Sequence, residues 1–132
     1  MQKSMDYMIK ELKNSGLTVY QKKVLAGLSL IPTGEISTYG DLAAFTGNGK
    51  ASRAVGGVMN INPFSPELPC HRVLSSDGGI GGFSSGTAKK RKMLAREGIS
   101  FSKGKMNQFS EKRHIFNLKD KNELKKLVKM IK

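Results

Sequence analysis

The only cysteine of this chain, Cys70, lies directly beside His71, between Pro69 and a short apolar run. A cysteine reacts as its thiolate, and a neighbouring imidazole can lower the pKa of a thiol enough to populate that form near neutral pH. A lone cysteine is, however, most often a small buried hydrophobic side chain. Cys70 and His71 are therefore a candidate nucleophile and base, and the rest of the chain must decide between the two interpretations.

Length and charge limit the other possibilities. The chain has 132 residues, enough for one domain with its own core but too few for two. With one cysteine and no basic start followed by a long apolar run, we expect a cytoplasmic, nucleoid-associated protein. The net charge of +13 and the pI near 10.0 favour a polyanionic partner, although charge alone does not separate DNA, RNA and anionic lipid.

The positive charge is densest near the C-terminus. Residues 101–132 hold 10 of the 23 Lys and Arg residues and 3 of the 10 acidic ones. Such a segment is either a solvated basic extension or an arm that contacts phosphates. The second histidine, His114, stands alone in this segment, and one cysteine with two histidines falls short of a zinc site, so we expect no metal.

The elements that must position Cys70 can be predicted from periodicity and capping. Helices are expected over residues 5–12 and from Thr18, as N-cap, to Ile31, where residues 32–34 end the helix. Thr38 and Asp41 have the spacing of a capping box and predict a brief helix. A turn at 47–49 separates it from a helix over 51–59, which together suggest a helix-turn-helix.

The second of these helices consists mostly of small residues and carries one long cation, Arg53. Small side chains permit close approach, either to another helix or to a DNA backbone or groove. Gly56 and Gly57 each cost about 1 kcal/mol of helix stability and so require some such reason. The sequence leaves these two interpretations open.

Three prolines make residues 60–69 a shaped, non-helical loop that leads to Cys70. We expect a strand over 70–75, a hairpin turn at 77–79 and irregular structure over the glycine-rich residues 80–86. Thr87 can cap a basic helix that runs to Glu97, with Gly98 at the C′ position. Residues 101–117 show no clear period, and a final amphipathic helix includes Leu124 and Ile131.

From about residue 17 to residue 98 the chain resembles the O6-alkylguanine-DNA alkyltransferase family of DNA-repair proteins. The motifs that carry this resemblance occur in the family's order and spacing. They are YGDLA at 39–43, SRAVGG at 52–57, NP at 62–63, PCHRV at 69–73, GGFS at 81–84 and REG at 96–98. The resemblance implies a mainly α fold with a short β-hairpin and a winged-helix-like helix-turn-helix. It divides the chain into an N-terminal helix (1–16) in place of the usual N-terminal domain, an active-site domain (17–100) and a basic extension (101–132).

The resemblance also implies roles for individual residues. Cys70 would accept the alkyl group, His71 would act on it as a base through a water molecule, and Glu97 would orient the histidine. Asn62 would be the hinge that couples the loop to the helix-turn-helix. Tyr39 would offer its hydroxyl to the flipped base. Taken alone, Glu97 would be an ordinary carboxylate near a helix end and Tyr39 a half-buried packing residue.

Further residues would contact the DNA. Because the target base is stacked inside the duplex, it must be rotated out before a thiol can reach it. Arg53 would fill the gap from the minor groove. The other DNA-contacting residues would be Thr38, Tyr39, Ala51, Ser52 and Gly56, and the substrate pocket would be walled by Leu68, Gly81, Phe83 and Ser84.

The resemblance therefore predicts single-turnover transfer of an alkyl group from O6-alkylguanine, with O4-alkylthymine as a further substrate, in double-stranded DNA, by a monomer that needs no cofactor. Ser65 and Phe83 depart from the proline and tyrosine of several relatives, which bears on the width of the pocket. Two alternatives are a damage sensor without transfer, in which the cysteine is replaced, and a winged-helix transcriptional regulator. Cys70 argues against the first, and the second leaves Cys70, His71 and Glu97 without a purpose.

Overall fold

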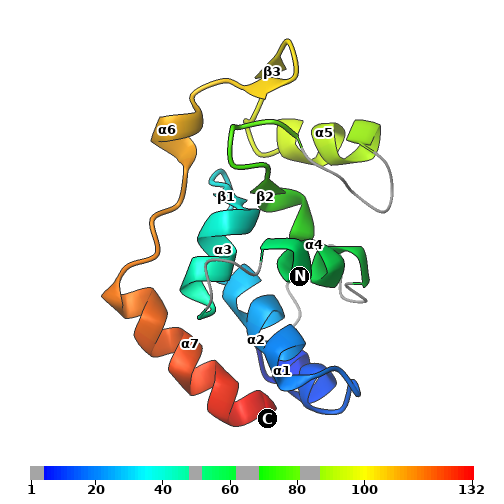
Figure 1. The fold of residues 1–132 in the computed structure, drawn as a ribbon, viewed down its shortest axis with the longest axis vertical. Coiled ribbons are helices and arrows are strands. Elements are labelled where there is room, and N and C mark those ends of the chain that lie inside the picture. The colour runs from blue at the N-terminus through cyan, green and yellow to red at the C-terminus, as the bar shows by residue number, and fades with distance from the viewer. Residues whose placement is uncertain (1–4, 48–51, 62–68, 81–86) are drawn as a thin grey trace.

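The computed structural model describes residues 5–47, 52–61, 69–80 and 87–132, and within these it is mainly helical (Figure 1). The helices are α1 Met5–Lys13, α2 Val19–Leu28, α3 Tyr39–Phe45, α4 Ser52–Ile61, the 3-10 turn η1 Cys70–Arg72, α5 Thr87–Ala95, α6 Phe109–Lys112 and α7 Leu118–Ile131. The strands are β1 Ser37–Thr38, β2 Val73–Leu74, β3 Phe101–Ser102 and β4 Lys105–Met106. None of the helices described is long and apolar enough to cross a membrane.

The first two helices lie where the sequence predicts them. The Thr18 hydroxyl accepts from the backbone N–H of Gln21, and the Gln21 side chain accepts from the backbone N–H of Thr18, which is a complete capping box. Helix α2 ends at Leu28, short of the predicted end at Ile31. Two overlapping turns after Leu28 still carry Ile31 into the core, where it is buried.

Helices α3 and α4 pack against each other, as the predicted helix-turn-helix requires. The Thr38 hydroxyl caps α3 by accepting from the backbone N–H of Asp41 at 3.0 Å. The predicted capping box is only half formed, because the Asp41 carboxylate binds the guanidinium of Arg113 and not the start of its own helix. A partner distant in sequence has thus displaced the local one.

The strands differ from the prediction. Strand β2 pairs in parallel with β1, joining Ser37 to Val73, and the expected strand over 70–75 is reduced to residues 73–74. The turn after it exists, since the backbone N–H groups of Ser75 and Gly78 bond to Gly79 and Ser75. Among the described residues, however, the short β-hairpin lies at β3 and β4, where the sequence shows no clear period.

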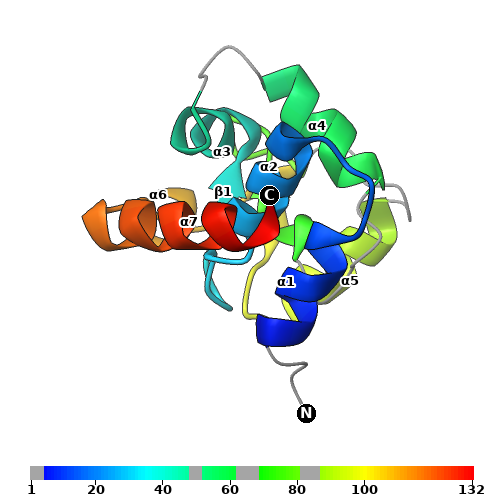
Figure 2. The ribbon, with the colours of Figure 1, turned by 90° about the horizontal axis from the view of Figure 1, so that it is seen from below.

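The main core lies among α1, α2, α3 and α4, and α7 closes it. Leu124, Leu127 and Ile131 of α7 are buried in the same apolar cluster as Leu25 and Val55. Figures 1 and 2 place α7 beside α2 and α1. Helix α7 therefore completes the core, while its lysines are exposed.

A smaller apolar cluster lies beneath α5. It contains Ile36, Leu74, Leu94, Ile99 and Met106. They come from the residue before β1, from β2, from α5 and the turn after it, and from β4. This cluster therefore fixes α5 relative to the turn that bears Cys70.

Candidate active site

The turn η1 brings two neighbouring side chains to one carboxylate. The Nε2 atom of His71 lies 2.8 Å from Oε2 of Glu97, and Nε of Arg72 lies 2.8 Å from Oε1 of the same residue. In an extended strand, successive side chains point to opposite faces. The tight turn, closed by the Arg72 N–H on the Pro69 carbonyl at 3.0 Å, allows both side chains to face Glu97 and replaces the predicted strand.

Glu97 lies just beyond α5, in the turn that ends the helix. Its N–H bonds to the carbonyl of Leu94 at 2.9 Å, and Gly98, the predicted C′ residue, takes a positive φ of 83° there. Burial raises the pKa of the Glu97 carboxyl, but hydrogen bonds from Arg72 and His71 outweigh burial and hold the pKa below its usual value. Glu97 is therefore an ionised acceptor between two donors.

This charge state fixes the proton on His71. An ionised carboxylate only accepts hydrogen bonds, so Nε2 of His71 carries a hydrogen and donates it to Glu97. Burial lowers the pKa of His71, against the opposing effect of Glu97, so the ring is neutral near pH 7. Its second nitrogen, Nδ1, then carries a lone pair, and it is buried with no hydrogen-bond partner within the described part of the chain. His71 is thus ready to take up a proton at Nδ1.

Arg72 ties this pair to the end of α2. Its guanidinium donates to the carbonyl of Ile31 at 2.8 Å and to the hydroxyl of Thr33 at 2.9 Å, besides its two bonds to Glu97. Glu97 therefore cannot turn away from His71 without breaking contacts that span two parts of the fold. No role for Arg72 beyond its place in the motif could be predicted from the sequence.

Cys70 begins the turn and is 3% exposed. Tyr39, the first residue of α3, is half-buried, and burial, followed by the charge of a Cys70 thiolate, raises the pKa of its hydroxyl. Tyr39 therefore stays protonated near neutral pH and lies close enough to Cys70 to sense its charge. Thr38 is fully buried as the cap of α3.

Lys90 of α5 is a member of the site that the sequence analysis missed. It is 0% exposed, and its ammonium donates to the carbonyl of Val73 at 2.6 Å and lies 5.8 Å from the centre of the Tyr39 ring. Burial lowers its pKa to about 8, while the charge of a Cys70 thiolate opposes that shift. The run KKRK at 89–92 is typical of a solvated helical face. The spacing of Lys90, Leu94 and Glu97, however, puts all three on one side of the helix, and this spacing could have indicated that Lys90 faces the site.

Helix α4 presents the predicted DNA-contacting cation to solvent. Arg53 and Gly57 are exposed, and a Cβ atom at Gly56 or Gly57 would meet nothing within 4 Å. Close packing against another described element therefore does not explain these glycines, and this finding favours approach from outside.

The remaining predicted residues lie outside the described part of the chain. They are Ala51, Asn62, Leu68, Gly81, Phe83 and Ser84, together with the side chain of Ser52. Their roles as hinge, groove contacts and pocket walls stay predictions. The residues that the structure does bring together are Cys70, His71, Glu97 and Tyr39, with Arg72 and Lys90 added to them.

Comparison with known proteins gives a consistent result. Residues 19–99 match the family model described as 6-O-methylguanine DNA methyltransferase, DNA binding domain. A methylated-DNA–protein-cysteine methyltransferase of Methanothermobacter thermautotrophicus is 40% identical over 95 residues, which are 72% of this chain and 53% of that protein. The chain spans about half the length of such curated relatives.

Some of the solved structures that resemble this chain contain DNA. S. pombe Atl1, in complex with damaged DNA containing O6-carboxymethylguanine, superimposes with a TM-score of 0.64 at 29% identity, covering 73% of this chain and 94% of that one. Mycobacterium tuberculosis OGT in complex with DNA gives a TM-score of 0.61 at 38% identity, covering 62% of this chain and 50% of that one. The similarity thus extends to both sequence and fold.

Proposed function

Because this chain belongs to the 6-O-methylguanine DNA methyltransferase family, we propose that it transfers an alkyl group from O6 of a guanine in double-stranded DNA to Cys70. The observation that carries the proposal is the neutral His71, fixed by Glu97, beside a buried thiol. The protein acts as a monomer without a cofactor and is consumed by one reaction. O4-alkylthymine is a second substrate of the same chemistry.

The reaction is a displacement at the alkyl carbon. The Cys70 thiolate attacks that carbon, an S–C bond forms, and the bond from the carbon to O6 breaks with its electron pair left on guanine. His71 takes the thiol proton at Nδ1 through a bridging water, and Glu97 stabilises the imidazolium that results. A proton then restores neutral guanine, so that thiol and alkylguanine become thioether and guanine.

Tyr39 supplies the proton to the departing base. Its hydroxyl stays protonated because burial raises its pKa, and α3 holds it beside Cys70. The His71 imidazolium replaces that proton after transfer, which closes the balance. Lys90, buried nearby, keeps the thiolate and the departing guanine in a positive local field.

DNA binds to α3 and α4. The exposed Arg53, with Gly56 on the same helix, enters the minor groove and fills the space of the flipped nucleotide. Ala51 and Ser52 allow the close approach. Thr38, which is fully buried, contributes by capping α3 and not by touching DNA. Asn62 couples this docking to the pocket, which Leu68, Gly81, Phe83 and Ser84 line.

The test weighs the intact protein after incubation with a duplex that contains O6-methylguanine. We expect a gain of one methyl group in the wild type and no gain in Cys70→Ser. Tight binding to the lesion without any mass change would instead identify a damage sensor. Sequence-selective binding to undamaged DNA would identify a regulator.

A further inference from the structure

The backbone between α6 and α7 runs beside the start of β1. The N–H of Ile36 donates to the carbonyl of Lys112 at 2.9 Å, and the N–H of His114 donates to the carbonyl of Ile36 at 2.7 Å. Ile36 and Arg113 thereby form a parallel bridge directly before β1. This segment, residues 112–116, lies beyond the residues 19–99 that match the family.

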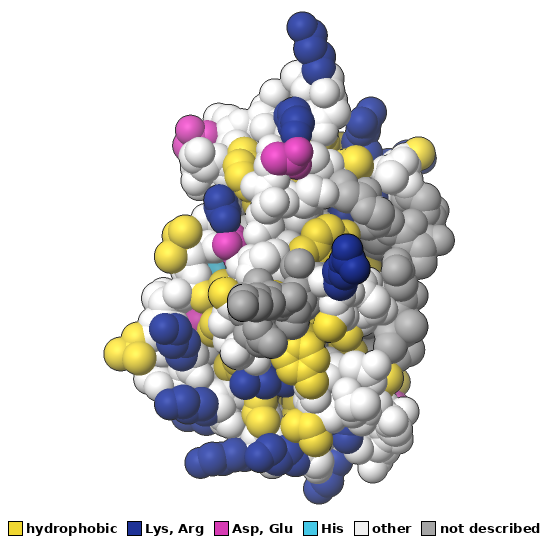
Figure 3. All heavy atoms as spheres, in the orientation of Figure 1, with side chains coloured by type: hydrophobic (Ala, Val, Ile, Leu, Met, Phe, Trp, Pro, Cys, Tyr) yellow, Lys and Arg dark blue, Asp and Glu magenta, His cyan; other side chains and the backbone are white. Residues whose placement is uncertain are grey.

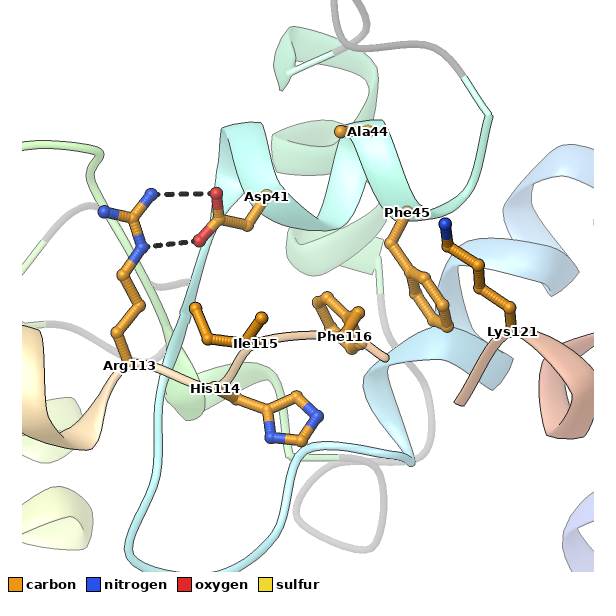
Figure 4. A pocket seen from close by; sticks show the side chains of 8 residues that line it. All are labelled: Asp41, Ala44, Phe45, Arg113, His114, Ile115, Phe116 and Lys121. Atoms are coloured by element: carbon orange, nitrogen blue, oxygen red, sulfur yellow. Dashed lines mark hydrogen bonds and ion pairs between the residues drawn. The ribbon is translucent and has the colours of Figure 1, made fainter. Parts of the chain in front are cut away.

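Side chains of the segment contact both ends of α3 (Figure 4). At the first turn, the guanidinium of Arg113 grips the carboxylate of Asp41 with two bonds of 2.7 and 2.8 Å. At the last turn, the ring of Phe116 stacks on Phe45 at 3.9 Å with an interplanar angle of 5°. A paired Arg–carboxylate fork and a stacked ring both restrict orientation, not only distance.

The segment is anchored in turn. The Nδ1 atom of His114 lies 2.8 Å from a carboxylate oxygen of Glu35, and its Nε2 atom lies 2.9 Å from a carboxylate oxygen of Asp120. His114 therefore joins the segment before β1 to the first turn of α7. Helix α7 is itself held in the core by Leu124 and Leu127. The contacts on α3 therefore belong to a part of the chain that cannot drift independently of the core.

Helix α3 needs such support. It has seven residues, and helices shorter than about 12 residues are marginal in water without tertiary contacts. Only Leu42 and Ala43 of α3 are buried. Yet α3 begins at Tyr39, beside Cys70, and packs against α4, which carries Arg53.

We propose that residues 112–116 are a brace that sets the position of α3, and that Arg113 and Phe116 are positioning residues for transfer from duplex DNA. The proposal rests on the proposed function. In a duplex, Tyr39 and Arg53 must meet one flipped nucleotide at the same time, so a small rotation of α3 with α4 is costly. A free alkylated base can settle in the pocket without α4.

The experiment compares the rate of methyl transfer from a duplex with the rate of reaction with free O6-benzylguanine. Arg113→Ala should slow the duplex reaction about five-fold, an effect of about 1 kcal/mol, and the free-base reaction by less than two-fold. Phe116→Leu should also slow the duplex reaction more than the free-base reaction. Phe116→Tyr, which keeps the ring, should have the wild-type ratio of the duplex rate to the free-base rate. Lys10→Ala, which removes one exposed charge from α1, is the matched control and should change neither rate.

A thermodynamic cycle tests whether Arg113 acts through Asp41. In an Asp41→Asn background, Arg113→Ala should have no further effect on the ratio of the two rates. If Arg113→Ala slowed both reactions equally, or changed the ratio just as much in the Asp41→Asn background, the positioning role would be overturned. The slowing would then reflect a general loss of stability.

Hydrogen exchange separates this proposal from the proposed function. Arg113→Ala should lower the protection of the amides of residues 39–45 and leave that of α5 unchanged. If the wild type gains no methyl group but this change occurs and affinity for duplex DNA falls, the brace stands and the reaction is wrong. Unchanged protection of α3 would overturn the brace whatever the protein does to DNA.

Discussion

Histidine and arginine are adjacent at two places in this chain, as His71 with Arg72 and as Arg113 with His114. Both pairs meet acidic side chains in the folded protein. In the first, both side chains converge on Glu97, and we call these three residues the Glu97 cluster. In the second, each side chain finds carboxylates of its own, and we call Glu35, Asp41, Arg113, His114 and Asp120 the Arg113 cluster.

The difference lies in the second nitrogen of each ring. His114 has a carboxylate on both sides, so both of its ring nitrogens are already engaged in contacts that hold the segment in place. His71 has a carboxylate on one side only, and its Nδ1 is buried with no hydrogen-bond partner among the described residues. The same residue types therefore build a clamp in one place and a base in the other. What distinguishes them is the number of acids that converge on the imidazole.

The largest expected effect is on the rate of transfer, when histidine is replaced by glutamine in one cluster and then in the other. His71→Gln should lower the rate of transfer to Cys70 by about 10²–10⁴-fold, because it removes the base that generates the thiolate. His114→Gln should change the rate by less than about five-fold, because it alters only a contact of the brace. Both rates are measured by quenched-flow incubation with methylated duplex, followed by mass spectrometry of the intact protein. Similar losses in both variants would show that the two clusters do not differ in function.

The pH dependence of stability distinguishes the two regions. Lys90, near the Glu97 cluster, is a fully buried cation, whereas Arg113 of the Arg113 cluster is partly exposed. The pKa of Lys90, about 8 in the folded protein, lies below the ordinary 10.5 of the unfolded chain. Between these values the unfolded chain binds more protons, so the free energy of unfolding should rise with pH, by at most about 3 kcal/mol. Below pH 8 both states are protonated and the cost of burying the charge is fully present.

Denaturant unfolding between pH 7.5 and 10.5 measures this rise. Lys90→Met should be more stable than the wild type at pH 7.5 and should show no rise from this source. Lys121→Met, an exposed lysine beside the Arg113 cluster, should keep the wild-type profile. A wild-type profile that falls over this range would contradict the burial of the Lys90 charge.

A smaller effect is expected on the acid side. Burial lowers the pKa of His71 from the ordinary 6.5, so just below pH 6.5 the unfolded chain binds more protons than the folded one. The free energy of unfolding should therefore fall as the pH drops from 7 to 5.5. His71→Gln should flatten this decline, and an unchanged decline in His71→Gln would contradict the burial of its ring. Thermal unfolding at several pH values in this range gives the comparison directly.

The sequence was sufficient where structure depends on near neighbours. The helices from Met5 and from Thr18, the cap at Thr38 and the turn at Gly98 follow from local patterns, and all are confirmed. Cys70 and His71 were recognisable as a pair because they are adjacent. Their partner Glu97 is 26 residues from His71, and only the family resemblance could connect them.

The sequence was insufficient where a partner lies far along the chain. Residues 101–117 have no period because their order comes from β3–β4 pairing and from bonds to Ile36, not from a repeating apolar face. Asp41 looked like half of a capping box, yet its carboxylate binds Arg113, 72 residues away. Lys90 looked solvated within a basic run, because nothing local shows that the carbonyl of Val73 will meet its ammonium.

The smallest effect concerns the lysines of α7, whose role as a phosphate-contacting arm the structure leaves as a prediction. Lysine side chains gather at the lower edge of the molecule, over α7, in Figure 3. Lys119, Lys121, Lys125, Lys126, Lys129 and Lys132 are all exposed. Substitution is the suitable test, since deleting α7 would uncover the core that Leu124 and Leu127 close.

We expect Lys125→Gln with Lys129→Gln to reduce the slope of log affinity against log salt by about 2 for undamaged duplex, because each phosphate contact contributes about 0.9. The matched control is Lys10→Gln with Lys13→Gln on α1, which removes the same charge from another exposed surface. Fluorescence anisotropy across a salt series measures both slopes. Equal slopes in the two double variants would mean that α7 contributes only to the general positive field, and that its lysines keep the core-closing helix soluble without touching DNA.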